Sequence, residues 1–262
     1  MPGLQREPSL ALAEFGGAEP QPGGQVAALW RYPVSSMAGE RLDVAPVQYS
    51  GVIGDRIWGV VDASSERIAS PGREKNFIRV PHGHARFRGT GVEVSVDGRD
   101  WAAPDDARVL DELSALFGFP ASLRPFQPAG EAGFRPRYEH APIHLITTAA
   151  MRTLQRALPK SVIDERRFRP NILVELPDGP EPIPENGWIG REIRIGDLVL
   201  RGREPCGRCG FITIEQDGLP LDVEVLRTIV RQHSRNFGVY CDVISPGEIR
   251  TDDALAIGGR DA

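Results

Sequence analysis

Apolar residues in the first half of the chain come in short runs bounded by glycine, proline and aspartate. The runs are residues 26–36, 56–63 and 91–98. They are rich in β-branched and aromatic residues, which is typical of strands. Residues 104–119 differ, because their apolar positions lie on one helical face. That face comprises Val109, Leu110, Leu113, Leu116 and Phe117. This stretch therefore predicts a helix, with Asp105 or Asp106 as its N-cap.

The second half mixes predicted strands with two predicted helices. Residues 142–159 indicate a strand that runs into a helix, with Thr147 or Thr148 at the boundary. Residues 221–234 indicate another helix, capped by Asp222. The strand-like segments of this half are residues 171–176, 188–202 and 210–218. The whole pattern predicts a β-rich α+β fold.

Glycine and proline divide this pattern into parts. Residues 1–24 hold four prolines and five glycines without a sustained period, which predicts a flexible arm. Residues 126–140 are rich in proline, glycine and charge, which predicts a linker between domains. We therefore expect an N-terminal β-rich domain over residues 25–125 and a second domain over residues 141–262.

Composition limits the classes of function. A chain of 262 residues is long enough to bury a full hydrophobic core, and 26% charged residues with a net charge of −5 describe a globular protein with no predicted nucleic-acid partner. The sequence has neither a signal-peptide pattern at its start nor an apolar run of about 18 residues, so we predict a cytoplasmic protein with no membrane contact. Three cysteines are too few for a disulfide framework, and in a reducing compartment they stay available for chemistry.

Two of the three cysteines, Cys206 and Cys209, form a C-x-x-C pair around Arg208. A structural zinc site lacks its second half, because Cys241 lies 32 residues beyond Cys209 and no H-x-x-x-H accompanies it. A thioredoxin-like redox pair needs a helix N-terminus, whereas residues 210–218 predict a strand. Two half-buried thiols packed as small hydrophobes remain an alternative. Neighbouring arginines, however, favour a thiolate that binds a metal or attacks an electrophile.

Four segments together resemble the two-domain MOSC proteins, named after the C-terminal domain of molybdenum cofactor sulfurase. The segments are "LWRYPVSSMAGE", "GDRIWGVVD", "RFRPNILVE" and "WIGREIRIGDLVLRGREPCGRCGFITIEQDG". The resemblance runs from about Val26 to the C-terminus. It implies a β-rich N-terminal domain followed by a β-barrel MOSC domain with peripheral helices. It also implies a molybdenum-pyranopterin cofactor, with Cys209 as the protein's metal ligand and Arg208 beside it as a tuning residue.

The resemblance also implies a set of cofactor-binding residues. They are Ser35, Ser36, Arg56, Thr147, Thr148, Arg169 and Asn171. All are hydrogen-bond donors, as the anionic tail of such a cofactor requires. Members of the family usually have a lysine where this chain has Ser35, which removes one positive charge from the expected site. The histidines offer no alternative ligand set, and we predict that His82, His84, His140 and His144 lie in loops or at the surface.

The implied activity is the reduction of small N-oxygenated substrates. Three cysteines cannot build a [2Fe–2S] cluster with four thiolates, so a separate electron-donor protein is expected. Two alternatives stay open. One is a sulfur carrier that holds a cysteine persulfide on Cys206 or Cys209 without a stable metal. The other is a catalytically silent cofactor-binding module.

Overall fold

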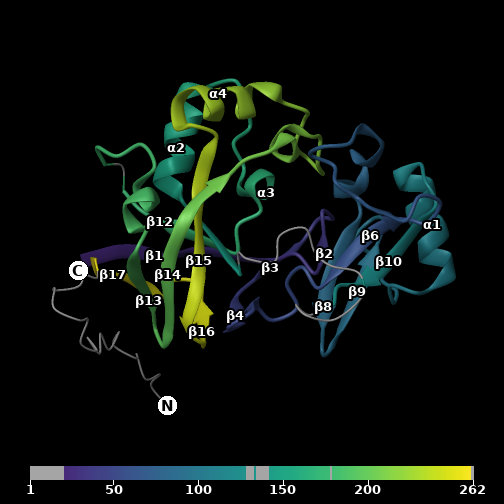
Figure 1. Cartoon of the computed structure of the whole chain (residues 1–262), viewed down its shortest axis with the longest axis horizontal. Helices are drawn as coiled ribbons and strands as arrows, with labels where there is room; N and C mark the ends of the chain where they lie inside the picture. The colour runs from purple at the N-terminus through teal and green to yellow at the C-terminus, as the bar shows by residue number, and fades with distance from the viewer. Residues whose placement is uncertain (1–20, 128–132, 134–141, 178, 261–262) are drawn as a thin grey trace, which may run out of the picture.

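The computed structural model describes residues 21–127, 133, 142–177 and 179–260. Their helices and strands form two groups that lie side by side (Figure 1). One group contains β1 and most elements from β11 onward. The other contains β2, β6 to β10 and α1. The functional pocket described below takes its walls from both groups.

Seven strands close into a barrel. They run in the order β12-β11-β15-β14-β13-β17-β1, and β1 closes the ring by pairing with β12. Their bounds are β1 Gln21–Arg31, β11 Ile143–Thr147, β12 Ile172–Glu175, β13 Arg191–Ile195, β14 Leu198–Gly207, β15 Asn236–Ser245 and β17 Ala254–Arg260. The short strand β3 (Glu40–Leu42) pairs with β1 outside the ring. Inward-facing aliphatic side chains, among them Leu29, Ile193 and Leu200, fill the barrel.

The second group is built around β6. This strand (Trp58–Asp62) pairs with β10 (Ala121–Pro125), β2 (Val34–Ser35) and β7 (Arg67–Ile68). A hairpin of β8 (His84–Arg88) and β9 (Gly91–Ser95) and the helix α1 (Ala107–Phe117) complete its core. Two short 3-10 helices, η1 (Lys75–Phe77) and η2 (Val80–His82), connect β7 to β8.

The predicted cap of α1 is confirmed. The Asp106 side chain accepts a hydrogen bond from the backbone N–H of Val109, and Gly118 ends the helix in the left-handed conformation at φ 82°. Val109, Leu113 and Phe117 are the buried residues of this helix. The 3.6-residue period therefore identified the right face.

A small sheet packs against the core of the barrel. Its strand β4 (Val44–Gln48) pairs with β5 (Gly51–Val52) on one side and with β16 (Gly247–Arg250) on the other. Because β16 immediately precedes β17, this pairing ties the first part of the chain to the end of the barrel.

Helices cover one end of the barrel (Figure 1). They are α2 (Thr148–Ala157), α3 (Glu165–Phe168), α4 (Val223–His233), and the 3-10 helices η3 (Pro184–Trp188) and η4 (Gly210–Thr213). The predicted caps Thr147 and Asp222 accept hydrogen bonds from Ala150 and Glu224, respectively. Within the described residues, no helix combines the length and the apolar character that a membrane crossing requires. The predicted β-rich α+β fold with a barrel and peripheral helices is confirmed.

The predicted end of the arm was wrong. Residues 21–24 belong to β1, where Gln21 lies opposite Ile257 and Pro22 opposite Ala256. The ladder shifts register between Pro22 and Gly24, and Gly24 has φ 96°, so proline and glycine here form a bulge rather than a flexible segment. Residues 1–20 lie outside the described residues.

The pairing of the strands crosses the predicted boundary between the two domains. Although β1 belongs to the segment 25–125 in sequence, it pairs with β12 and β17 in the barrel. Of the predicted linker 126–140, only residues 126, 127 and 133 are described. The division into two sequence domains stays a prediction.

The strand predicted for residues 210–218 is also wrong. Residues 210–213 form η4, and Cys209 occupies its N-cap position. The prediction relied on alternation, but the consecutive residues Phe211 and Ile212 are both buried. A short 3-10 turn buries adjacent side chains, whereas a strand would place them on opposite faces.

Candidate functional site

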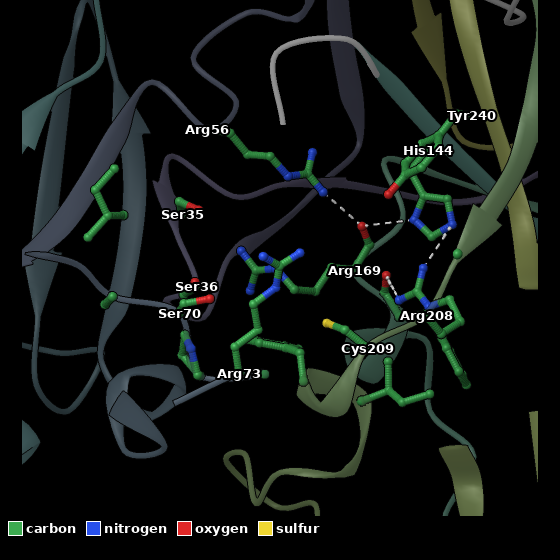
Figure 2. A pocket seen from close by; sticks show the side chains of 18 of the residues that line it. Ser35, Ser36, Arg56, Ser70, Arg73, His144, Arg169, Arg208, Cys209 and Tyr240 are labelled. Carbon is green, nitrogen blue, oxygen red and sulfur yellow. Dashed lines mark hydrogen bonds between the residues drawn. The ribbon is translucent and has the colours of Figure 1, made fainter. Parts of the chain in front are cut away.

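A pocket lies where the two groups of elements meet (Figure 2). Its polar walls come from the end of β2, the turn before β6, the loop after β7, strand β11, the end of α3, the β14–η4 junction and strand β15. The polar lining residues are Ser35, Ser36, Arg56, Ser70, Arg73, His144, Arg169, Arg208, Cys209 and Tyr240. The described lining contains four arginines and no aspartate or glutamate. Such a lining favours an anionic ligand.

Three lining residues adopt backbone conformations that are rare for residues other than glycine. The φ angles of Ser36, Arg56 and Arg169 are 72°, 53° and 56°. Non-glycine residues in this left-handed region cost about 1 kcal/mol or more each, and they concentrate at functional sites. The three strained residues come from three separate segments of the chain, and all three line the same pocket.

Arg56 is held by a network that reaches across the two groups. Its Nη1 donates to the Asn171 side-chain oxygen at 3.2 Å, its Nη2 donates to the Arg169 carbonyl at 2.9 Å, and it forms an ion pair with Asp55. Burial opposes its charge, but Asp55 and Tyr32 favour it, so the pKa of Arg56 lies above its ordinary value. Arg56 therefore presents a fixed cation.

Arg169 occupies the centre of the view in Figure 2. Its guanidinium carbon lies 4.0 Å from the centroid of the Tyr32 ring and 5.3 Å from that of Phe211, and its Nη1 donates to the Met37 carbonyl at 2.5 Å. Burial, together with the charge of Arg56, lowers the pKa of Arg169 to about 10, so it remains cationic at neutral pH. Its buried Nη2 has no hydrogen-bond partner within the part of the chain that the structure describes. A buried free donor of this kind is available to a ligand.

His144 is a correction to the sequence analysis, which placed it in a loop or at the surface. It is 3% exposed on β11 and lines the pocket. Its Nδ1 lies 3.2 Å from the Arg169 carbonyl, and its Nε2 lies 3.5 Å from Arg208 Nη1. Because the guanidinium is only a donor, Nε2 is the acceptor and Nδ1 carries the proton. Burial and the charge of Arg208 hold the pKa of His144 well below its usual range, so the ring is neutral.

The two cysteines of the C-x-x-C pair have different environments. Cys206 is fully buried and accepts a hydrogen bond from Arg208 Nη1 at 2.7 Å. Cys209 is partly exposed, and its sulfur points into the pocket (Figure 2). Arg208 also donates to the Phe168 carbonyl at 2.7 Å, so its side chain is fixed behind Cys209. The described residues hold no group of three or more His, Cys, Asp or Glu side chains arranged for a metal ion. A ligand at Cys209 must therefore bring other donors with it.

Two glycines allow the loop after β7 to approach Cys209 closely. A Cβ atom on Gly72 would lie 2.8 Å from the Cys209 sulfur and 2.7 Å from the Phe211 nitrogen. A Cβ atom on Gly210 would lie 2.6 Å from the Gly72 carbonyl oxygen. Both positions therefore require glycine. The loop of residues 70–73 therefore forms the wall of the pocket next to the Cys209 thiol.

The structure brings together six of the nine predicted site residues. Ser35, Ser36, Arg56, Arg169, Arg208 and Cys209 line the pocket. Asn171 lies directly behind it: its side-chain oxygen accepts from Arg56 and from the His144 backbone N–H at 3.1 Å. Asn171 thus positions two lining residues without lining the pocket itself.

Thr147 and Thr148 do not line the pocket. Thr147 caps α2 and donates to the Glu185 carboxyl at 2.7 Å, while Thr148 exchanges hydrogen bonds with the backbone of Leu176. Their hydroxyls are satisfied by the protein, so we do not propose that they contact a cofactor. His144, three residues earlier in the same strand, provides the contribution of β11 to the pocket.

The contact of Thr147 with Glu185 leads to a testable pH dependence. Glu185 is fully buried, and burial raises its pKa to about 7. The folded protein therefore binds a proton that the unfolded chain, with an ordinary glutamate pKa of 4.5, releases as the pH rises between about 4.5 and 7. We expect the free energy of unfolding to fall across this window by roughly 3 kcal/mol. Urea unfolding at pH 5 and pH 8 measures the change.

The matched variant for this prediction is Glu185→Gln. It keeps the shape and an acceptor oxygen for the Thr147 backbone N–H, which lies 3.3 Å from the carboxyl, but it does not titrate. The pH dependence between pH 5 and 8 should become much smaller in the variant. An equal dependence in both proteins would assign the effect to another group.

Four polar lining residues escaped the sequence analysis: Ser70, Arg73, His144 and Tyr240. The stretch "SPGR" at residues 70–73 has the composition of a turn and carries an arginine, which was a usable signal. His144 and Tyr240 lie opposite each other on paired strands, and nothing in a local pattern marks them. Burial and the neighbouring Cys206 raise the pKa of the Tyr240 phenol, so it keeps its proton.

The fold and the pocket together define a class: a strand barrel with an attached β-rich unit, which presents one thiol within an arginine-rich pocket. Two family models match the chain in agreement with this description. The MOSC domain matches residues 126–256, and the MOSC N-terminal beta barrel domain matches residues 23–98. The chain belongs to the MOSC family, as its motifs predicted.

Several curated proteins are similar to this chain. Human mitochondrial amidoxime-reducing component 1 is 26% identical over 90% of this chain and 84% of its own length. Rat mitochondrial amidoxime reducing component 2 is 33% identical over 44% of this chain and 36% of its own length. Molybdenum cofactor sulfurase 2 of Culex quinquefasciatus is 33% identical over 37% of this chain, but over only 13% of its own length. Among solved structures, the YuaD protein of Bacillus subtilis is 14% identical with a TM-score of 0.49, covering 91% of this chain and 97% of that protein.

Proposed function

We propose that this protein is a molybdenum-cofactor-dependent oxidoreductase that reduces N-oxygenated substrates with electrons from a separate donor protein. One observation carries the proposal: a partly exposed thiol, Cys209, faces a pocket whose described lining holds four arginines and no carboxylate. The similarity to human amidoxime-reducing component 1 supports the same activity, because it extends over most of both chains.

The donor chemistry of the pocket fits a pyranopterin cofactor. A cysteine thiolate is a good ligand for a soft metal, and guanidinium groups bind phosphate in a fork geometry. Two guanidinium nitrogens, Arg169 Nη2 and Arg208 Nε, are buried without a hydrogen-bond partner among the described residues. Buried donors without partners are costly unless a ligand satisfies them.

The roles of the chain's own residues follow from their contacts. When bound, the cofactor would supply the oxygen-atom transfer and the two-electron chemistry at molybdenum. Cys209 would be the protein's ligand, and Arg56 and Arg169 would hold the anionic part. Arg208 is fixed between Cys206, His144 and the Phe168 carbonyl, where it favours negative charge near Cys209.

Reduction of an N-hydroxyl group to an amine consumes two electrons and two protons and releases water. Tyr240 lines the pocket as a neutral phenol and can donate a hydrogen bond to the departing oxygen. The electrons must come from outside the chain, because Cys206 and Cys241 are both fully buried and three cysteines cannot ligate an iron–sulfur cluster of four thiolates.

A second candidate function is a sulfur carrier. Two of the sulfurases that match this chain reach 33% and 36% identity over less than half of it, and a third is 26% identical over 87% of it. In this function the partly exposed Cys209 would hold a persulfide, and the arginines would stabilise its negative charge without a metal.

Elemental and mass analysis separate the two functions. Protein purified from a host that makes the cofactor is expected to hold about one molybdenum per chain and to reduce an N-hydroxylated benzamidine with a chemical electron donor. Metal-free protein carrying a mass increase of one sulfur on Cys209 would favour the carrier. Full molybdenum without N-hydroxyl reduction would contradict the proposed reaction and leave a silent cofactor-binding module.

A further inference from the structure

Arg73 differs from the other three arginines of the pocket. Arg56, Arg169 and Arg208 all donate side-chain hydrogen bonds to other protein groups. Arg73 is exposed, and its guanidinium makes no hydrogen bond or ion pair with a described residue. In Figure 2 its side chain points from the loop after β7 toward the centre of the pocket. Among the described residues, no acidic group pairs with this cation.

The loop that carries Arg73 is fixed. Pro71 is buried, and the backbone N–H groups of Arg73 and Glu74 donate to the Ser70 carbonyl at 2.9 and 3.0 Å. Gly72 packs against the Cys209 sulfur so closely that no side chain fits there. The position of Arg73 beside the thiol is therefore built into the backbone, although its side chain remains free to move.

The nearest acid in sequence does not neutralise Arg73. Glu74 instead forms an ion pair with Arg67 on strand β7. Three lining hydroxyls, those of Ser35, Ser36 and Ser70, lie on the same wall as Arg73 in Figure 2. None of these hydroxyls takes part in a hydrogen bond with a described residue. A free guanidinium beside free hydroxyls is the donor set that binds an oxyanion.

We propose that Arg73, with Ser35, Ser36 and Ser70, forms an oxyanion-binding corner of the pocket that takes a phosphate or carboxylate group. The corner is separate from the arginine network of Arg56, Arg169 and Arg208. The inference rests on the proposed function for the source of the oxyanion, which is either the phosphate of the cofactor or an acidic group on the substrate. The chemistry of recognition is the same for both.

The test begins with protein that contains no cofactor. Full-length protein made in a host without cofactor synthesis is titrated calorimetrically with inorganic pyrophosphate. Arg73→Ala is expected to weaken binding about tenfold, since a charge-assisted contact is lost, and Arg73→Lys should weaken it less. Arg79→Ala is the matched control, because Arg79 is an exposed arginine nearby that does not line the pocket. Equal affinity for wild type and Arg73→Ala would overturn the proposal.

A second variant tests whether a positive charge at a neighbouring position of the corner can replace that of Arg73. Adding Ser35→Lys to Arg73→Ala should restore at least part of the pyrophosphate affinity, because an ammonium replaces the lost cation. The benefit should shrink as the salt concentration rises, as expected for exposed charges. If the double variant binds no better than Arg73→Ala at low salt, Arg73 does not act through its charge.

The source of the oxyanion is decided in cofactor-loaded protein. If Arg73 binds the cofactor phosphate, Arg73→Ala should lower the molybdenum content. If Arg73 binds an acidic group of the substrate, the molybdenum content should stay unchanged. The KM should then rise about tenfold for a carboxylate-bearing N-hydroxyl substrate, but not for a neutral one. Normal molybdenum with unchanged KM for both substrates would contradict a role in either. If wild-type protein holds no molybdenum, the proposed function fails, and the pyrophosphate titration still tests the corner.

Discussion

Cys209→Ser is expected to lower the molybdenum content of the purified protein to less than about one tenth of the wild-type value. A serine hydroxyl is a poor ligand for a soft metal, whereas a cysteine sulfur is a good one. Cys209 is also the only cysteine whose sulfur faces the pocket, since Cys206 and Cys241 are fully buried. Inductively coupled plasma mass spectrometry of protein from a cofactor-producing host gives the measurement.

The control for this substitution is Cys241→Ala. Cys241 is buried in the barrel core and does not line the pocket, so its loss should reduce stability slightly and leave the molybdenum content unchanged. Circular dichroism of Cys209→Ser should match wild type, because the thiol is partly exposed and makes no hydrogen bond with a described residue. Unchanged metal in Cys209→Ser would remove Cys209 as the ligand and, with it, the proposed site.

Arg169→Ala is expected to weaken cofactor retention by roughly ten- to a hundredfold. The substitution removes a buried cation whose free Nη2 is available to an anion, and a charge-assisted hydrogen bond contributes about 1.5–3 kcal/mol. It also removes the contact with the Tyr32 ring and the hydrogen bond to the Met37 carbonyl, which hold this wall of the pocket in place. Dialysis followed by molybdenum and pterin analysis measures retention.

Two variants separate charge from geometry at this position. Arg169→Lys keeps the charge but loses the planar fork, so its retention should fall between wild type and Arg169→Ala. Arg166→Ala, on the same short helix, removes an arginine that pairs with Asp164 outside the pocket and should have no effect on retention. Equal losses in Arg166→Ala and Arg169→Ala would mean that the helix, rather than the Arg169 side chain, matters.

Local patterns were sufficient for the elements whose contacts are local. The apolar face of α1 and the caps Asp106, Thr147 and Asp222 all depend on residues within one turn of each other. The β-rich class follows from alternation and composition in the same way. The family motifs also pointed to Cys209, Arg56 and Arg169, which line the pocket, because each motif carries its residues in a short segment.

The pocket itself depends on contacts between distant segments. The Arg56 guanidinium binds the carbonyl of Arg169, 113 positions away, and Asn171 supports both Arg56 and His144. The sequence analysis chose Thr147 and Thr148 from the β11 segment and dismissed His144. All five residues of β11 are buried, so hydrophobicity along the strand does not mark the side that faces the site.

By itself, the sequence determined a β-rich family fold, the N-caps of three helices and a cysteine with cationic motifs, since each of these is set by neighbours in the chain. Only the tertiary structure decided that β1 closes the barrel, that residues 210–213 turn after Cys209, and that Arg73 reaches the same pocket. The physical reason is that buried polar groups are held by hydrogen bonds to whatever partners the fold places beside them. In this pocket those partners come from strands and loops far apart in the chain.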